Sequence, residues 1–218
     1  MGALSRRLDT VTSGALVLAR DKHTAGLLAR DFRLKRVVKY YVALSDRKPS
    51  KKMGSVVGDM QKGRRGSWML ARTCHNPAVT RFVSAAVPGR RPGLRGFVLR
   101  PETGQTHQLR VALKSLGAPV LGDGRYGQAE RARLEDRGYL HCAAMRFQTP
   151  GGPVQVVCQP LEGLEFQSLE FNAVFSGWFP SGMVEQHGTW FEEHTLLRSS
   201  LLDHEDSRIS WADPGKTA

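Results

Sequence analysis

The chain has 218 residues, enough for one domain with a sizeable core or one domain and a tail, and its formal net charge is +12. Residues 1–158 carry 29 Lys and Arg against 10 Asp and Glu, whereas residues 159–218 carry 3 against 10, so the body favours nucleic acid as its partner and an anionic membrane second. No stretch has the length and apolarity of a membrane span, so we expect no membrane association. The three cysteines are widely spaced and form no disulfide framework, so we expect a location in the cytoplasm or a nucleic-acid-containing organelle.

The first distinctive stretch is Arg6-Arg7-Leu8-Asp9-Thr10-Val11-Thr12-Ser13-Gly14, followed by an apolar run that predicts a strand over 15–19. The guanidinium groups before Asp9 favour its ionised form, which an attacking or proton-abstracting carboxylate needs. The hydroxyl and glycine residues after it suit a turn packed closely against other backbone. The alternative is a surface loop in which Asp9 forms an ordinary ion pair with Arg7.

A helix and a strand come next. Asp21 is placed to cap a helix whose apolar residues, at helical spacing, run to Leu34. Residues 37–44 then alternate or run apolar, which predicts a strand. This strand carries Tyr41, with Lys39 two positions away on the same face. A tyrosine in a strand is also typical of half-buried packing.

Residues 46–67 form a basic connector, expected as an exposed loop with a short strand. Its cations either contact phosphate or form a solvated face, and the candidates for phosphate contact are Lys51, Lys52, Arg64 and Arg65. Further strands are predicted near 67–73, 78–87 and 94–100, because turn residues separate these stretches.

A second polar cluster opens a predicted helix. We expect Thr106 to cap a helix that Gly117 ends and that presents His107, Arg110 and Lys114 at intervals of three and four. A lone arginine on a helix is more often solvated or paired at the surface. The motif context favours a functional interpretation here.

The remaining elements complete the sheet. Gly122-Asp123-Gly124 predicts a tight turn, and strands near 140–147 and 154–158 close the sheet. His107, His141 and Cys142 lack metal-ligand spacing, so we assign no metal site. The order of elements predicts an α+β class with a mixed, mainly antiparallel sheet and flanking helices.

Five of these segments, in this order, resemble motifs of the RluA family of pseudouridine synthases. The Asp9 segment resembles the family's His-Arg-Leu-Asp-x-x-Thr-Ser-Gly, and residues 39–44 resemble Lys-x-Tyr-x-Ala-Leu. Residues 103–111 resemble Thr-Gly-Arg-Thr-His-Gln-Ile-Arg-Val, and residues 116–127 resemble Leu-Gly-x-Pro-Ile-x-Gly-Asp-x-x-Tyr-Gly. Residues 139–150 continue the series.

The resemblance implies a synthase-like catalytic domain over 1–160, and we expect an acidic, partly disordered tail over 161–218. It implies an isomerase, without metal or cofactor, that converts a flipped-out uridine in tRNA or rRNA to pseudouridine, and we expect a monomer. It assigns catalysis to Asp9, stacking on the target base to Tyr41 and holding of Asp9 to Arg110. The residues expected to bind substrate or RNA are Arg7, Lys39, His107, Lys51, Lys52, Arg64 and Arg65.

Two departures from the family pattern keep other functions open. Arg6 stands where the family has His, and Asp9 lies only eight residues from Met1, whereas the family places strands and a helix before this motif. The chain is therefore expected to be short at its amino terminus. The main rival interpretation is an inactive RNA-binding protein with the synthase fold. A third is a basic structural protein that binds an acidic partner or its own tail, which salt-sensitive RNA binding would separate from the first two.

Overall fold

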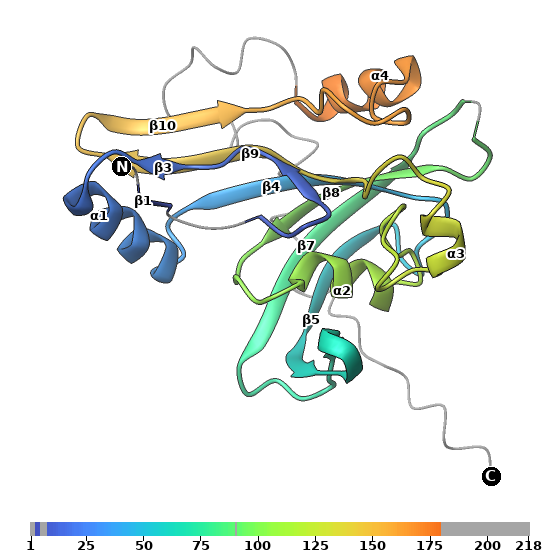
Figure 1. Cartoon of the computed structure of the whole chain (residues 1–218), viewed down its shortest axis with the longest axis horizontal. Coiled ribbons are helices and arrows are strands. Elements are labelled where there is room, and N and C mark those ends of the chain that lie inside the picture. The colour runs from blue at the N-terminus through green and yellow to red at the C-terminus, as the bar shows by residue number, and fades with distance from the viewer. Residues whose placement is uncertain (1–2, 5–7, 90, 180–218) are drawn as a thin grey trace.

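The computed structural model of the protein describes residues 3–4, 8–89 and 91–179, arranged as shown in Figure 1. The helices are α1 (Lys22–Arg33), α2 (Gln108–Ser115), α3 (Ala129–Ala132) and α4 (Leu169–Trp178), and a 3₁₀ turn, η1, covers Arg64–Gly66. The strands are β1 (Ala3–Leu4), β2 (Thr12–Gly14), β3 (Leu18–Ala19), β4 (Val38–Ser45), β5 (Met53–Lys62), β6 (Trp68–Leu70), β7 (Pro77–Ala86), β8 (Arg95–Pro101), β9 (Leu140–Thr149) and β10 (Gly152–Val157). None of the helices in these residues has the length and apolarity needed to cross a membrane.

Most of these strands belong to one sheet. Its order is β10-β9-β4-β8-β7-β5-β6, and each neighbouring pair is antiparallel. Strand β2 joins β9 in parallel, and β1 pairs with β3 separately. The predicted α+β class with a mixed, mainly antiparallel sheet and flanking helices is confirmed. The strands predicted from residue 67 onward are also found, with ends shifted by a few residues.

Alternate side chains of the central strand β4 point into two cores on opposite faces of the sheet. Val42 and Leu44 belong to a core that includes residues of α4, whereas Ala43 belongs to a core that includes residues of α2. Figure 1 shows α2 and α4 on opposite sides of the strands. Tyr41 and Lys39 lie at alternate positions with Ala43, so they face the α2 side, which is where the candidate site lies.

The strand predicted over 15–19 is wrong in extent, because β2 ends at Gly14 and β3 is only Leu18–Ala19. Gly14 has a φ of +109°, which turns the chain away from β9 after three paired residues, and β3 pairs with β1 instead. The helix that follows is confirmed. Asp21 caps α1, and its Oδ1 accepts a hydrogen bond from the Thr24 N–H at 2.8 Å.

The prediction of an exposed connector with a short strand over 46–67 is wrong for nearly half of its length, because residues 53–62 form the ten-residue strand β5, which pairs with β7. Gly54, Val56 and Gly58 are buried, with more exposed residues between them, which is the period of two expected for a strand. Two of these three inward positions are glycines. The sequence therefore lacks the apolar side chains that would have revealed the strand.

The segment after residue 160 packs against the sheet. Phe166, Phe171, Phe175 and Phe179 are each at most 4% exposed, and successive ring centroids lie 4.9 to 5.9 Å apart. These rings join the core that contains Leu44 and Val98. The packed body therefore extends past residue 160, where the predicted catalytic domain ends. Residues 180–218 lie outside the described residues, and a tail there stays a prediction.

Candidate active site

Asp9 lies just before β2, in a turn fixed by backbone contacts. The Thr12 N–H donates to the Asp9 carbonyl at 2.8 Å, and β2 then places Gly14 opposite Cys142 of β9. A Cβ atom at Gly14 would overlap the Cys142 carbonyl, so only glycine allows this approach. The close pairing of β2 with β9 thus sets the position of Asp9. The predicted contact residue Arg7 lies outside the described residues.

A buried polar network holds β2 against β9. His141 Nε2 lies 2.9 Å from the Cys158 carbonyl and can only donate to it, which leaves Nδ1 to accept from the Ser13 hydroxyl at 2.8 Å. The Arg137 guanidinium donates to the same hydroxyl oxygen. Burial lowers the pKa of His141, which favours the neutral ring that this pattern requires.

The turn before α2 is organised differently from the prediction. The N-cap is His107, in the left-handed conformation with a φ of 58°, so the cap predicted at Thr106 is wrong. Gln108 fixes the turn instead, because its Oε1 accepts from the Thr103 hydroxyl at 2.8 Å and the Gln105 N–H at 2.9 Å. Its amide nitrogen donates to two oxygens of β7 at 2.9 Å each. His107 therefore precedes the helix rather than forming part of its first turn.

The Arg110 side chain, only 4% exposed, joins two carboxylates. Its Nη1 donates to Asp9 Oδ2 at 3.0 Å, while Nε and Nη2 donate to the two oxygens of Asp123 at 2.7 and 2.8 Å. Burial disfavours the charged guanidinium, but the bonds to Asp123 and then to Asp9 outweigh it and raise the pKa of Arg110. The structure thus brings Asp9 and Arg110 together, as the resemblance implies, and their roles in a reaction stay predictions.

Asp123 is the site residue that the sequence analysis missed. Its side chain is 0% exposed, and Oδ1 also accepts the backbone N–H groups of Arg125 at 3.0 Å and Tyr126 at 3.2 Å. The tight turn predicted here is present, and Gly122 has a φ of +76°. One signal was available in the sequence. Arg110 stands among apolar residues of its helix, and a buried guanidinium needs a carboxylate partner.

A second donor reaches Asp9 from His107. His107 Nε2 lies 3.3 Å from Asp9 Oδ1, and Nδ1 lies 2.7 Å from the Tyr126 hydroxyl, whose oxygen accepts the Trp68 N–H at 2.9 Å. The Tyr126 hydroxyl then donates its proton to Nδ1, which places the proton of the neutral ring on Nε2, facing Asp9. Burial lowers the pKa of His107 and so favours this neutral form, although the nearby Asp9 charge acts in the opposite direction.

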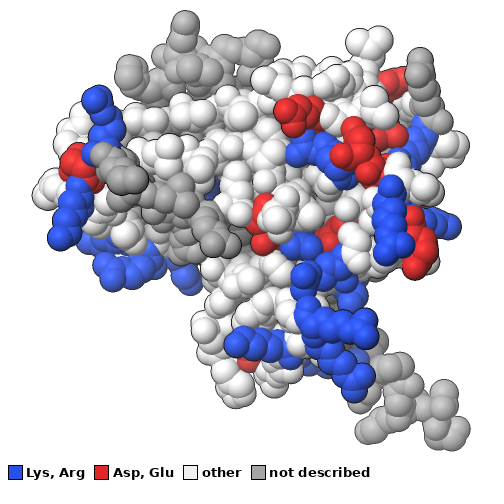
Figure 2. Space-filling model, viewed as in Figure 1, with Lys and Arg blue, Asp and Glu red and all other residues white. Residues whose placement is uncertain are grey.

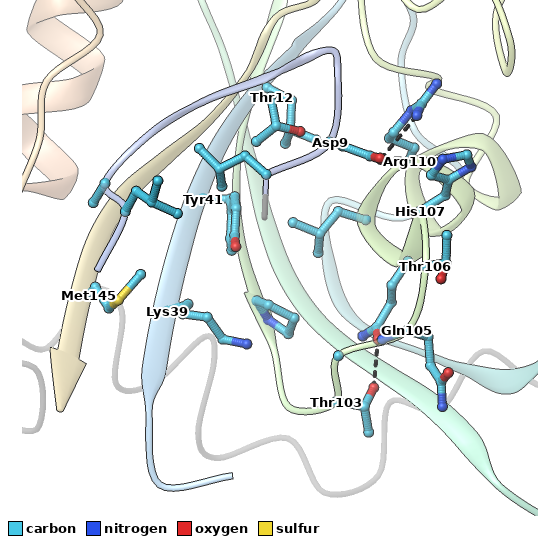
Figure 3. Close-up of a pocket in the computed structure, with 18 of the residues that line it drawn as sticks. Asp9, Thr12, Lys39, Tyr41, Thr103, Gln105, Thr106, His107, Arg110 and Met145 are labelled. Atoms are coloured by element: carbon cyan, nitrogen blue, oxygen red, sulfur yellow. Dashed lines mark hydrogen bonds and ion pairs between the residues drawn. The ribbon is translucent and has the colours of Figure 1, made fainter. Parts of the chain in front are cut away.

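These groups open onto a pocket of about 330 Å³, a size typical of small-ligand sites. Figure 3 shows Asp9, His107 and Arg110 on one side of it, with Tyr41 and Lys39 coming from β4 on the other. Apolar side chains complete the wall: Leu8, Ala15, Leu16, Val17, Leu140 and Met145. The arrangement can place a carboxylate against a small, mostly apolar ring system.

Tyr41 lies half-buried in that wall, opposite Cys142 of the neighbouring strand β9. Burial raises the pKa of the Cys142 thiol to about 12, and a hydrogen bond with Tyr41 acts in the opposite direction. The Tyr41 hydroxyl therefore has a partner inside the protein. What Tyr41 offers to the pocket is mainly its ring.

The basic residues predicted to contact RNA fall at the two ends of β5. Lys51 and Lys52 precede this ten-residue strand, and Arg64 and Arg65 follow it in η1, so the two pairs are separated by about 30 Å. Arg125 donates to the Arg65 carbonyl at 2.7 Å, which ties the η1 end to the turn beside the pocket. Figure 2 shows a cluster of Lys and Arg over the lobe that β5, η1 and β6 form in this view. The predicted connector thus carries two separate basic patches.

The chain is similar to known proteins along much of its length. A family model described as RNA pseudouridylate synthase matches residues 3–115. A Haemophilus influenzae protein named as an uncharacterized RNA pseudouridine synthase is 48% identical over 160 residues, which cover 73% of this chain and 69% of that protein. Ribosomal large subunit pseudouridine synthase D of Borreliella burgdorferi is 35% identical over 137 residues, 62% of this chain and 41% of that protein.

A solved structure agrees with these matches. Human RNA Pseudouridylate Synthase Domain Containing 1 superposes with a TM-score of 0.61 at 28% sequence identity, covering 80% of each chain. The match to the family model ends at Ser115, the last residue of α2. The match to the Haemophilus protein covers more of the chain. The fold, the motifs and the relatives agree, and the chain belongs to the RluA-type RNA pseudouridine synthases, a family of isomerases.

Proposed function

We propose that this chain converts uridine in RNA to pseudouridine, with Asp9 as the catalytic carboxylate. One observation carries the proposal: the Asp9 carboxylate borders the 330 Å³ pocket while donors from Arg110 and His107 fix it from behind. The Asp9 side chain is held in this way and is still 29% exposed, so its carboxylate can reach a ligand in the pocket. A protein that only binds RNA needs positive charge but gains nothing from a carboxylate so held.

The reaction is an isomerisation. The bond from C1′ to N1 breaks, the uracil turns within the pocket, and a bond from C1′ to C5 forms. The proton on C5 leaves and N1 gains one, so the atoms balance without an oxidant or a hydrolytic water. Asp9 supplies the carboxylate that attacks the nucleoside or takes a proton from it, and Arg110 keeps that carboxylate oriented.

The target uridine leaves its stack to enter the pocket, because its sugar and base edges are otherwise inaccessible, and unstacking costs a few kcal/mol. The half-buried Tyr41 ring is positioned to stack on the flipped uracil. Contacts between basic residues and the RNA backbone offset the unstacking, for which Lys51, Lys52, Arg64 and Arg65 are candidates. A monomeric enzyme is part of this proposal.

We further propose structured RNA, rRNA or tRNA, as the substrate. The name of the Borreliella relative specifies the large ribosomal subunit, which supports rRNA over tRNA, although this chain spans only 41% of that protein. Mapping of pseudouridine in each RNA class after reaction would make that choice.

The experiment uses bulk cellular RNA labelled with tritium at uridine C5, since bond formation at C5 releases the label into water. We expect release by the full chain and a loss of more than about 10³-fold for Asp9→Asn. Glu130→Gln removes an exposed carboxylate from the first turn of α3, away from the pocket, and should release tritium like the wild type. Salt-sensitive RNA binding without any release would instead favour the inactive RNA-binding protein.

A further inference from the structure

A second cavity, of about 220 Å³, adjoins the candidate active site. Five residues line both cavities: Phe32, Lys39, Pro101, Thr103 and Gly104. Figure 3 shows the Lys39 amine directed from β4 toward the segment that carries Thr103 and Gln105. A strand that enters the first cavity would therefore pass close to the second.

The second cavity has a strong excess of positive charge. Its lining includes Lys35, Lys39 and Arg100, against a single carboxylate, Glu102. Glu102 is already neutralised by an ion pair with Arg81. Within the described ranges, Lys35 forms no ion pair. The Arg100 guanidinium lies 6.0 Å from the ring centroid of Tyr40, which belongs to the core on the α4 side of the sheet, so it faces away from Lys39. The cavity therefore presents cations that a bound anion could neutralise.

The other polar groups of this cavity are engaged within the protein. The Thr103 hydroxyl accepts from the Val79 N–H at 2.9 Å and donates to Gln108 Oε1 at 2.8 Å. The Lys39 amine lies 5.7 Å from the Phe32 ring centroid, so it covers a ring that would otherwise be open to a base. These contacts favour an anionic group over a second nucleobase in the cavity.

The backbone fixes Lys35 at the edge of the cavity. This residue follows α1 with a φ of 58°, and its N–H donates to the Phe32 carbonyl at 3.2 Å. The Arg36 N–H then donates to the Asp31 carbonyl at 2.9 Å, which ends the helix. The Lys35 amine is therefore attached to an ordered helix end rather than to a long loop.

We propose that this second cavity is a subsite for the phosphodiester next to the target uridine, held by Lys35 and Lys39. The proposal rests on the proposed function, since it takes a uridine in the first cavity as its starting point. A nucleotide in an RNA strand carries a phosphodiester on each side, and one of them would lie at the residues that the two cavities share. Cations there bind the phosphate and hold the strand while the base is flipped.

The test measures binding of the full chain to a single-stranded RNA decamer of adenosines with one central uridine. Lys35→Gln removes a cation of the subsite, and Lys22→Gln removes an exposed one from the opposite end of the same helix. We expect Lys35→Gln to weaken binding about fivefold to tenfold and to reduce the slope of log K against log salt by about 1. Lys22→Gln should change the affinity less than about twofold.

A second probe replaces one phosphodiester beside the uridine with an uncharged methylphosphonate. At one of the two flanking linkages, the methylphosphonate should weaken binding by the wild type as much as Lys35→Gln weakens binding to the unmodified RNA. At that linkage it should weaken binding by the Lys35→Gln variant little further, because both changes remove the same contact. Equal losses for Lys35→Gln and Lys22→Gln, or additive losses with the methylphosphonate at both linkages, would overturn the subsite. Either result could occur alongside normal tritium release, so failure of the subsite is distinguishable from failure of the proposed activity.

Discussion

Asp9 and Asp123 bind the same guanidinium in very different environments. Asp123 is 0% exposed and accepts two bonds from Arg110 and two from backbone N–H groups, so its oxygens are occupied. Asp9 is 29% exposed and receives one donor from Arg110 and one from His107. The comparison shows how one arginine is held in place by a saturated carboxylate while a second carboxylate remains open to a ligand.

The two carboxylates therefore differ in what surrounds them: Asp123 supports Arg110, and Asp9 faces the pocket. Asp123 supplies the partner that a buried guanidinium requires, and Arg110 then presents a remaining N–H to the pocket. A site built only from Asp9 and Arg110 would lack this support. The same substitution made at each aspartate, and substitutions that alter the donors of Asp9, test this difference.

The largest effect is expected for Asp123→Asn, compared with Asp9→Asn. The Asp123 change leaves Arg110 buried beside a neutral amide, so the free energy of unfolding should fall by about 3 kcal/mol, whereas Asp9→Asn should lower it by less than about 1 kcal/mol. Both variants should lose tritium release. Urea unfolding monitored by fluorescence measures the difference, and equal stability losses would show that the two carboxylates are not distinct in this way.

A smaller effect is expected for Tyr126→Phe, which removes the hydroxyl between Trp68 and His107. Without it, no donor fixes the proton on His107 Nε2, so kcat should fall about 10-fold with little change in KM. Tyr139→Phe is the matched control, because the Tyr139 hydroxyl donates to Asp136 outside the pocket. That variant should lose stability but keep its kcat. A change in KM with an unchanged kcat for Tyr126→Phe would contradict the positioning role.

The smallest effect concerns pH. Burial lowers the pKa of His107 below its ordinary value of 6.5, in surroundings that also include Asp9, Arg110, Arg125 and Asp123. The unfolded imidazole takes up a proton near pH 6.5 and the native ring only at lower pH, so this contribution to stability is complete above pH 6.5 and lost as the pH falls through the native value. Kinetics should follow the same direction, since protonation puts a second proton on the Tyr126 side of the ring.

Urea unfolding between pH 5 and 8 measures this dependence. His107→Gln should flatten part of the acidic decline, and the remainder should include His141, whose pKa burial also lowers. A decline that is identical in the wild type and in His107→Gln would show that His107 is not responsible.

Much of the candidate site could be predicted because its residues stand in recognisable motifs. The positions of Asp9, Tyr41 and Arg110 around one pocket follow the motif order, and the strand alternation that pairs Lys39 with Tyr41 is visible in the sequence. Asp123 was missed because a tight turn explained its residues without a partner. Its partner, Arg110, lies thirteen positions away, and only the tertiary fold brings them together.

The errors in the fold have local causes. Strand β5 was hidden because glycines occupy inward positions at residues 54 and 58. The cap at Thr106 was wrong because a side chain further along, Gln108, fixes the turn through bonds to β7, which no local pattern records. Helix propensity and hydrophobic period report neighbours in sequence, and these contacts are between neighbours in space.

The four phenylalanines Phe166, Phe171, Phe175 and Phe179 cover apolar surface of the sheet, which protects the protein from degradation in a cell. These rings lie on the face of the sheet opposite α2, against residues of the central strands. A chain interrupted before them would retain every pocket residue and still leave a strip of bare apolar surface. Chaperones and proteases recognise such surface, so degradation rather than lost chemistry would limit how much enzyme survives.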